Sequence, residues 1–277
     1  MRVSAVAGQF YPGDKEGLRD AVSDLFLKAK EYAKETDALG GICAHAGYQY
    51  SGVAAATTYA SIKGIKSADT IVIMGPNHTG AGSLLSLSLQ DWETPLGVVK
   101  NDAELGKGIQ AHLKILDFDE RAHVSEHSIE VQLPFIQSLN PKAKIVPICM
   151  MGQELEIAQG LGRALHKAIP ESGKKVVVIA SSDFSHYIPA RAADERDHAA
   201  LSFITGMDAV EFENRVVSRG WSICGHGPIA ALVEYAKLMK CRGGELLYYT
   251  NSGAYGGGTD SVVGYASVIF PAPEKKK

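Results

Sequence analysis

The stretch KKVVVIASSDFSHY, residues 174 to 187, joins a continuous apolar run to a short polar segment that holds a carboxylate and an imidazole. The run 174–182 is typical of a strand buried on both faces, because Val and Ile pack well on a pleated sheet. Asp183 and His186 follow at its carboxyl end. In open parallel α/β sheets, ligands bind beyond that end of the strands. The stretch therefore predicts a buried sheet and the edge at which a site would lie.

Similar apolar runs recur along the chain, with helix-period segments between them. Further strands are predicted at 38–44, 69–75, 143–151 and 244–250. Helices are predicted at 15–34, where Asp14 is the N-cap, and at 52–63, 102–113, 128–139, 154–169, 191–204, 208–218 and 227–239. Regular alternation of strand and helix favours right-handed crossovers. We therefore predict an α/β fold with a mainly parallel central sheet and helices on both faces.

Two segments depart from this alternation. Residues 83–100 alternate in polarity around a Thr-Pro turn, and 261–270 is a second alternating run, so both are expected to add hairpin or antiparallel strands. The glycine-rich segment 252–260 is expected to be a hairpin loop. Since no linker or repeat is evident, we predict a single domain over 1–270 and a basic tail at 271–277.

Composition excludes several classes of partner. The net charge of -3, from 28 basic and 31 acidic residues, gives no electrostatic footprint for nucleic acid or for an anionic membrane. No apolar run approaches the roughly 18 to 20 residues that span a bilayer, and the first residues lack the pattern of a signal peptide. We expect a cytoplasmic protein with no nucleic-acid or membrane partner.

The four cysteines are scattered without CxxC spacing, which argues against a disulfide framework. Cys43 and Cys149 lie in apolar runs and are expected to be buried, inert thiols. Cys224 differs, because it lies at a junction just before the helix predicted at 227–239. A helix N-terminus lowers the pKa of a cysteine, so Cys224 is expected to ionise readily.

Imidazoles follow two other predicted strands. His45 comes directly after 38–44 and His78 follows 69–75, so both should meet Asp183 and His186 at one sheet edge. His127 begins the helix predicted at 128–139, where it either caps the first turn, as Ser125 could, or enters the pocket. The remaining histidines are expected to be solvated, with His226 the least typical of them: His112, His123, His166, His198 and His226.

Two imidazoles and a thiolate can hold a divalent transition metal with open positions for substrate or water. His45, His78 and Cys224 are therefore a candidate ligand set. Asp183 and His186 would face the open side as acid and base, or join the coordination sphere.

Two other functions use the same residues. A cysteine hydrolase would use Cys224 as nucleophile, His186 as base and Asp183 to orient it, but would have no need of His45 and His78. A binding or scaffold protein would use the pocket for a peptide or a partner, and the pocket could also be inert. The sequence contains no GxxxxGK[ST], HExxH or GxSxG motif.

Seven short motifs, in order along the chain, resemble the Memo family, whose prokaryotic members are also called AmmeMemoRadiSam system protein B. They are GQFYPGD (8–14), AHAGYQYSG (44–52), GPNH (75–78), EHSIEVQLPF (126–135), SSDFSHY (181–187), ICGHGPI (223–229) and SVVGYAS (261–267). The resemblance implies a fold like that of the class III extradiol dioxygenases, which are non-haem iron enzymes. The loop 251–265 departs from the family, having alanine and glycines where acidic residues are expected.

The resemblance also implies roles for individual residues. His45 and His78 match metal-binding histidines, Cys224 matches the third metal-site residue, and Asp183 and His186 match the remaining pocket residues. Independently of the resemblance, His127 is expected to contact substrate. The resemblance implies Fe(II), with copper or zinc as alternatives, and redox or dioxygenase-like activity on a small substrate. A thiol replaces the carboxylate ligand of the dioxygenases, which puts ring cleavage in question. The prokaryotic family name implies AMMECR1-like and radical-SAM proteins as partners.

Overall fold

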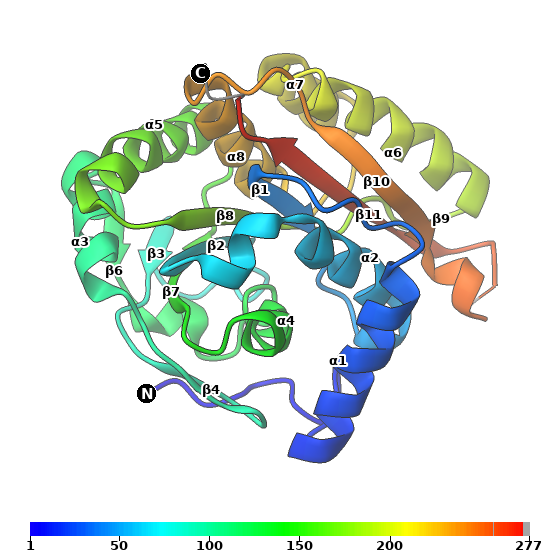
Figure 1. Ribbon diagram of the computed structural model, residues 1–277. Helices are drawn as coiled ribbons and strands as arrows, with labels where there is room; N and C mark the ends of the chain where they lie inside the picture. Colours follow the sequence, from blue (N-terminus) through cyan, green and yellow to red (C-terminus); the bar gives the residue numbers. More distant parts are fainter. Residues whose placement is uncertain (257, 274–277) are drawn as a thin grey trace.

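The computed structural model describes residues 1–256 and 258–273, so residue 257 of the glycine-rich loop and 274–277 of the predicted basic tail lie outside the described residues. A central sheet runs through the molecule in the order β10-β11-β1-β8-β2-β7-β3-β6, and β9 pairs with β11 (Figure 1). The strands are β1 (Ala38–Cys43), β2 (Thr70–Pro76), β3 (Leu85–Leu87), β6 (Leu116–Phe118), β7 (Lys144–Met150), β8 (Val176–Ser181), β9 (His186–Ile188), β10 (Glu245–Asn251) and β11 (Val262–Pro271). A separate hairpin is formed by β4 (Trp92–Thr94) and β5 (Gly97–Val99).

The centre of the sheet is parallel, as predicted. β8 pairs in parallel with both β1 and β2, and β2 pairs in parallel with β7. The added strands are antiparallel: β11 runs against β1 and β10, and β3 runs against β7. The hairpin predicted within 83–100 is the β4–β5 pair. The three-residue strands β6 and β9 were not predicted, because so few residues give no readable period.

Helices cover both faces of the sheet (Figure 1). They are α1 (Lys15–Ala29), α2 (Tyr48–Ser61), α3 (Ala103–His112), α4 (Leu133–Leu139), α5 (Leu155–Ser172), α6 (Ala190–Thr205), α7 (Ala209–Arg219) and α8 (His226–Leu238). The Asp14 carboxylate accepts a hydrogen bond from the backbone N–H of Gly17, which confirms it as the N-cap of α1. The α/β architecture that the sequence predicts is thus the observed one.

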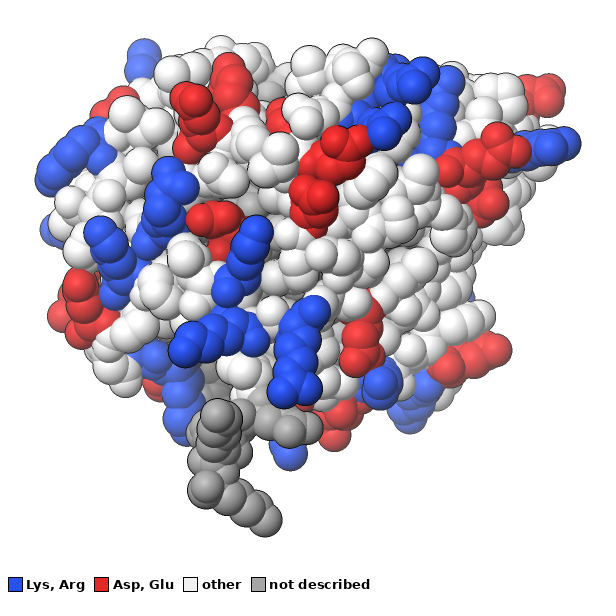
Figure 2. Space-filling model, turned by 90° about the horizontal axis from the view of Figure 1, so that it is seen from above, with Lys and Arg blue, Asp and Glu red and all other residues white. Residues whose placement is uncertain are grey.

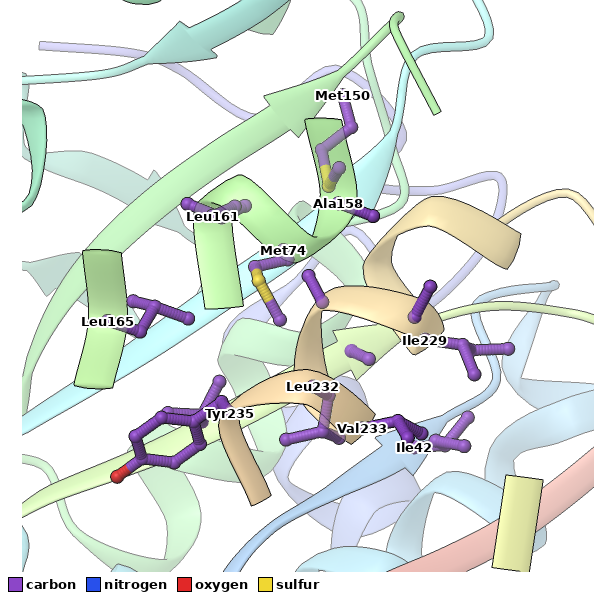
Figure 3. Packing of buried hydrophobic residues seen from close by; sticks show 14 of the residues in the cluster. Ile42, Met74, Met150, Ala158, Leu161, Leu165, Ile229, Leu232, Val233 and Tyr235 are labelled. Atoms are coloured by element: carbon purple, nitrogen blue, oxygen red, sulfur yellow. The ribbon is translucent and has the colours of Figure 1, made fainter. Parts of the chain in front are cut away.

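Two large hydrophobic clusters form most of the core, one on each face of the sheet. Successive residues of a strand point to opposite faces, and β2 accordingly gives Ile71 and Ile73 to the cluster under α1, α2 and α4, but Val72 and Met74 to the cluster under α5 and α8. Figure 3 shows the second cluster, where side chains of α5 and α8 pack together over the sheet. Burial on both faces explains why the central strands read as continuous apolar runs.

Three local predictions differ from the structure. The helix predicted at 128–139 is a 3-10 turn (Glu130–Gln132) followed by α4, and no side chain caps α4, so His127 is not its cap. β10 is an edge strand and is only partly buried, whereas burial on both faces was expected of most of the predicted strands. Pro271 pairs with Ala38, so the sheet extends one residue into the predicted tail.

The surface carries charges of both signs. Figure 2 shows Lys and Arg side chains interspersed with Asp and Glu on one face, between uncharged residues. In the part of the chain that the structure describes, no helix is long and apolar enough to cross a membrane.

Candidate metal site

One cavity of about 850 Å³ opens at the carboxyl ends of the central strands. β1, β8 and β2 are neighbours in the sheet, so the residues that follow them meet at one edge. The cavity wall includes every candidate site residue of the sequence: His45, His78, His127, Asp183, His186 and Cys224. The rule that ligands bind beyond parallel strand ends therefore locates this cavity correctly.

Three imidazoles form a compact cluster on the cavity wall. His45, His78 and His127 each offer a ligand atom, and these atoms all lie within 4.8 Å of one another. The His78 and His127 rings are stacked with centroids 4.6 Å apart, and His45 meets both edge-on, at 5.2 and 5.5 Å. The sequence associated His45 and His78 with Cys224; the structure adds His127 to these two imidazoles.

A buried hydroxyl fixes the tautomer of His45. Its Nδ1 lies 2.9 Å from Ser181 Oγ, which itself lies 2.6 Å from the carbonyl oxygen of Ser128. The single hydroxyl proton of Ser181 goes to that carbonyl, so His45 Nδ1–H must donate to Ser181 Oγ. Gln132 Nε2 also donates to Ser181 Oγ, at 2.8 Å. The lone pair of His45 is therefore on Nε2, the nitrogen left for a metal.

Glu126 holds the other two histidines. Its fully buried carboxylate accepts from His78 Nδ1 at 2.9 Å, and from the backbone N–H groups of His78, His127 and Ser128 at 2.5, 2.9 and 2.8 Å. Burial acts to raise the pKa of Glu126, but the hydrogen bond and charge of His78 lower it to about 2. A carboxylate accepts only, so His78 also presents Nε2 as its free nitrogen. Such outer partners are typical of metal-binding histidines.

The cluster suits a transition metal. Burial lowers the pKa of His45 well below its usual value, and the neighbouring His127 and His78 lower it further. Burial likewise lowers the pKa of His127 to about 4. Metals bind the neutral form of imidazole, and imidazole donors suit iron, zinc and copper. The three residues could therefore hold a metal ion, while the donor set leaves its identity open.

Cys224 lies beside His45, with Sγ 3.1 Å from His45 Nε2. The low pKa expected for the Cys224 thiol is wrong. Burial and the negative charge of Asp183 raise this pKa, although the backbone N–H of Asp183, which donates to Sγ at 3.2 Å, acts in the opposite direction. The N–H groups at the start of α8 have other acceptors, because Gly225 donates to Ser182 Oγ and Gly227 to Gln153 Oε1. Neither of these two N–H groups therefore donates to the sulfur.

Asp183 and His186 are close in sequence but have separate partners. Asp183 Oδ1 accepts the backbone N–H of His45 at 2.8 Å, and burial raises the pKa of this carboxyl. His186 Nδ1 donates to the Ser222 carbonyl oxygen at 2.7 Å, which leaves Nε2 as its basic nitrogen. The hydrolase arrangement, with Asp183 orienting His186 beside Cys224, is not formed, since the imidazole that contacts the thiol is His45.

Sequence reasoning missed several residues of this region. Glu126 directly precedes His127, and its place beside a candidate pocket residue was the one signal that could have identified it. Two histidines that were expected to be solvated are not: His226 lines the cavity, and His123 is fully buried next to Trp92.

The burial of His123 predicts a pH-dependent stability. Burial lowers its pKa from 6.5 to about 4, so between these pH values the unfolded chain binds a proton that the folded chain does not. The free energy of unfolding should therefore fall as the pH is lowered through this window, with roughly 3 kcal/mol due to His123. Urea unfolding of metal-free protein at a series of pH values should show a shallower dependence in His123→Phe. Equal dependence in both proteins would contradict this assignment.

Comparison with known proteins agrees with the resemblance in the motifs. The family model described as "Memo-like protein" matches residues 2–269. A MEMO1 family protein of Methanosarcina mazei is 46% identical over 97% of this chain and 98% of its own length. MEMO1 family protein Mbar_A1422 of Methanosarcina barkeri is 43% identical over 97% of this chain and 99% of its own.

The fold also occurs among solved structures. The crystal structure of uncharacterized protein JW3007 from Escherichia coli K12 matches with a TM-score of 0.51 over 73% of this chain and 86% of that chain. At 13% sequence identity, this likeness concerns the fold alone. The family model and the full-length relatives together show that the chain belongs to the Memo family.

Proposed function

We propose that the chain is a metal-dependent redox protein that acts on a small substrate in the cavity. His45, His78 and His127 would hold one divalent metal, which we propose to be iron, with the thiol of Cys224 beside His45. The observation that carries the proposal is the convergence of three ring nitrogens within 4.8 Å. Burial keeps His45 and His127 neutral, and the Ser181 hydroxyl and the Glu126 carboxylate hold the outer nitrogens of His45 and His78.

The chain's own groups would bind the substrate and move its proton. When bound, iron supplies one-electron redox chemistry and Lewis acidity. The aromatic side chains of Phe10, Tyr50 and Trp221 line the cavity and would exclude water around a bound substrate. His186 Nε2 has its lone pair available, because Nδ1–H is held by Ser222, so it would accept a proton from the substrate. Asp183, fixed by the His45 backbone N–H and with its pKa raised by burial, would be a second proton-holding group of the cavity wall.

Loss of two ligands should remove the metal. Anaerobically purified wild-type protein is expected to contain about one metal ion per chain, and His45→Ala/His78→Ala is expected to contain almost none, because one imidazole is too few to retain a divalent ion. Elemental analysis by mass spectrometry gives both the content and the element. Iron in the wild type would support redox chemistry, and zinc would support Lewis-acid chemistry instead.

The controls separate metal binding from misfolding and from surface adsorption. His198→Ala changes an exposed histidine on α6 and should retain the wild-type metal content. Circular dichroism should show the same secondary structure in all variants. Cys224→Ser tests the third ligand: full metal content in this variant assigns the position to His127, and a large loss assigns it to Cys224. Equal metal content in the wild type and the double variant would refute the metal site.

A further inference from the structure

A second histidine–carboxylate pair has its histidine, His226, in the cavity wall and shares no residue with the three-imidazole cluster. His226, at the start of α8, places Nδ1 2.9 Å from Oε2 of Glu213 on α7. The Glu213 side chain is 9% exposed and that of His226 21% exposed. A carboxylate so deeply buried is costly in free energy unless it accepts a hydrogen bond, and His226 donates one.

This pair fixes which nitrogen of His226 remains available. The carboxylate of Glu213 can only accept, so Nδ1 carries the ring proton and Nε2 has the lone pair. Among the described residues, Nε2 has no hydrogen-bond partner, although the ring lines the cavity. His226 thus offers a fixed hydrogen-bond acceptor to whatever occupies the cavity.

The rest of the cavity wall limits the charge of that occupant. None of the described residues that line the cavity is a lysine or an arginine. Val216, Trp221 and Ile223 line the same cavity as His226 and give it an apolar surface. Apart from any bound metal, the wall offers a carboxylate or phosphate no cationic side chain in exchange for its lost hydration, which is costly. An apolar body with one uncharged O–H or N–H group fits this wall.

We infer that His226, held by Glu213, is a recognition residue that selects an uncharged substrate through an O–H or N–H hydrogen bond to its Nε2. The inference shares the cavity of the proposed function and narrows its substrate class, but the hydrogen bond itself needs no metal. The Val216 and Trp221 side chains would contact the apolar part of the ligand.

Indole and its methylated analogue test this hydrogen bond. Indole carries one N–H donor, 1-methylindole has none, and neither is a good metal ligand. By isothermal titration calorimetry of metal-free protein, the wild type is expected to bind indole about 5- to 10-fold more tightly than 1-methylindole. In His226→Phe, which keeps a ring but has no acceptor, the preference for indole over 1-methylindole is expected to fall below about 2-fold. Indole-3-carboxylate should bind more weakly than indole to the wild type.

Controls and metal analysis make each outcome informative. His198→Phe, on the exposed side of α6, should keep the wild-type preference for indole. His226→Gln, which retains an acceptor oxygen, should keep part of it and provides a second variant if His226→Phe does not fold. An unchanged indole preference in His226→Phe, or stronger binding of the carboxylate, would overturn the inference. The titrations use metal-free protein, so they test the hydrogen bond whether or not the metal site exists, and the metal content of untreated protein tests the metal site separately.

Discussion

Replacing Arg2 by methionine is expected to lower the free energy of unfolding by about 3 to 5 kcal/mol, because it leaves a buried carboxylate without its cation. Arg2 forms an ion pair with Glu130, and both side chains are buried. The Glu130 carboxylate also accepts from the backbone of Ala5 and Val6 and from the Tyr11 hydroxyl. It therefore ties the N-terminal segment to the turn before α4.

The remaining contacts of Arg2 use the planar shape of its guanidinium. Nε donates to the carbonyl oxygen of His123 at 3.0 Å and Nη2 donates to that of Glu126 at 2.8 Å, while the group lies 4.3 Å from the centre of the Trp92 ring. A lysine cannot make this set of bonds, so Arg2→Lys should also destabilise the protein, though less.

Chemical denaturation with urea measures this effect against a matched control. Lys28→Met removes the cation of an exposed pair with Asp24 and should change the free energy of unfolding by less than about 1 kcal/mol. The double variant Arg2→Met/Glu130→Gln should be more stable than Arg2→Met alone, because it removes the uncompensated charge. A loss no larger for Arg2→Met than for Lys28→Met would show that the buried pair does not hold the N-terminal segment.

Replacing Glu126 by glutamine is expected to weaken metal binding about 10- to 100-fold, the usual effect of removing an outer partner of metal-binding histidines. Its carboxylate accepts from the His78 ring and from three backbone N–H groups. Glutamine has one acceptor oxygen, and its NH₂ group would face some of these donors. The His78 ring would lose its fixed orientation, and the buried negative charge beside the metal would be lost as well.

Competition with a chromophoric chelator measures the metal affinity of this variant. Glu120→Gln is the matched control, because Glu120 also accepts a backbone N–H, that of Leu89, and a hydroxyl, that of Ser88, and it does not line the cavity. The control should keep the wild-type affinity. Nitrogen-15 spectra of labelled histidine rings provide a second measurement, since the His78 signals should shift in Glu126→Gln only. Unchanged affinity and unchanged signals would mean that Glu126 has only a structural role.

The two predictions concern one connected network. Arg2 donates to the carbonyl oxygen of Glu126, and the Glu126 carboxylate holds His78. We therefore expect Arg2→Met to weaken metal binding as well as stability, and Glu126→Gln to lower stability as well as metal affinity, because buried N–H donors lose an acceptor. The N-terminal residues, which contain no candidate ligand, contribute in this way to the order of the site.

The sequence alone determined the architecture and the edge of the sheet at which the site lies. Continuous Val and Ile runs identify strands buried on both faces, and the chain direction of parallel strands brings their ends together. For that reason His45 and His78 could be placed in one cavity with Asp183 and His186 before the structure was known. These are local signals, each readable within about ten residues.

Only the tertiary structure decided which atoms meet within the cavity. The partners of His45 and His78 lie 136 and 48 residues away along the chain, so no local pattern could pair them with Ser181 and Glu126. The same holds for Cys224, whose pKa is raised by burial and by the distant Asp183 although its sequence position predicted the reverse. The pKa of a group depends on its full three-dimensional surroundings, because desolvation and neighbouring charges act through space and not along the chain.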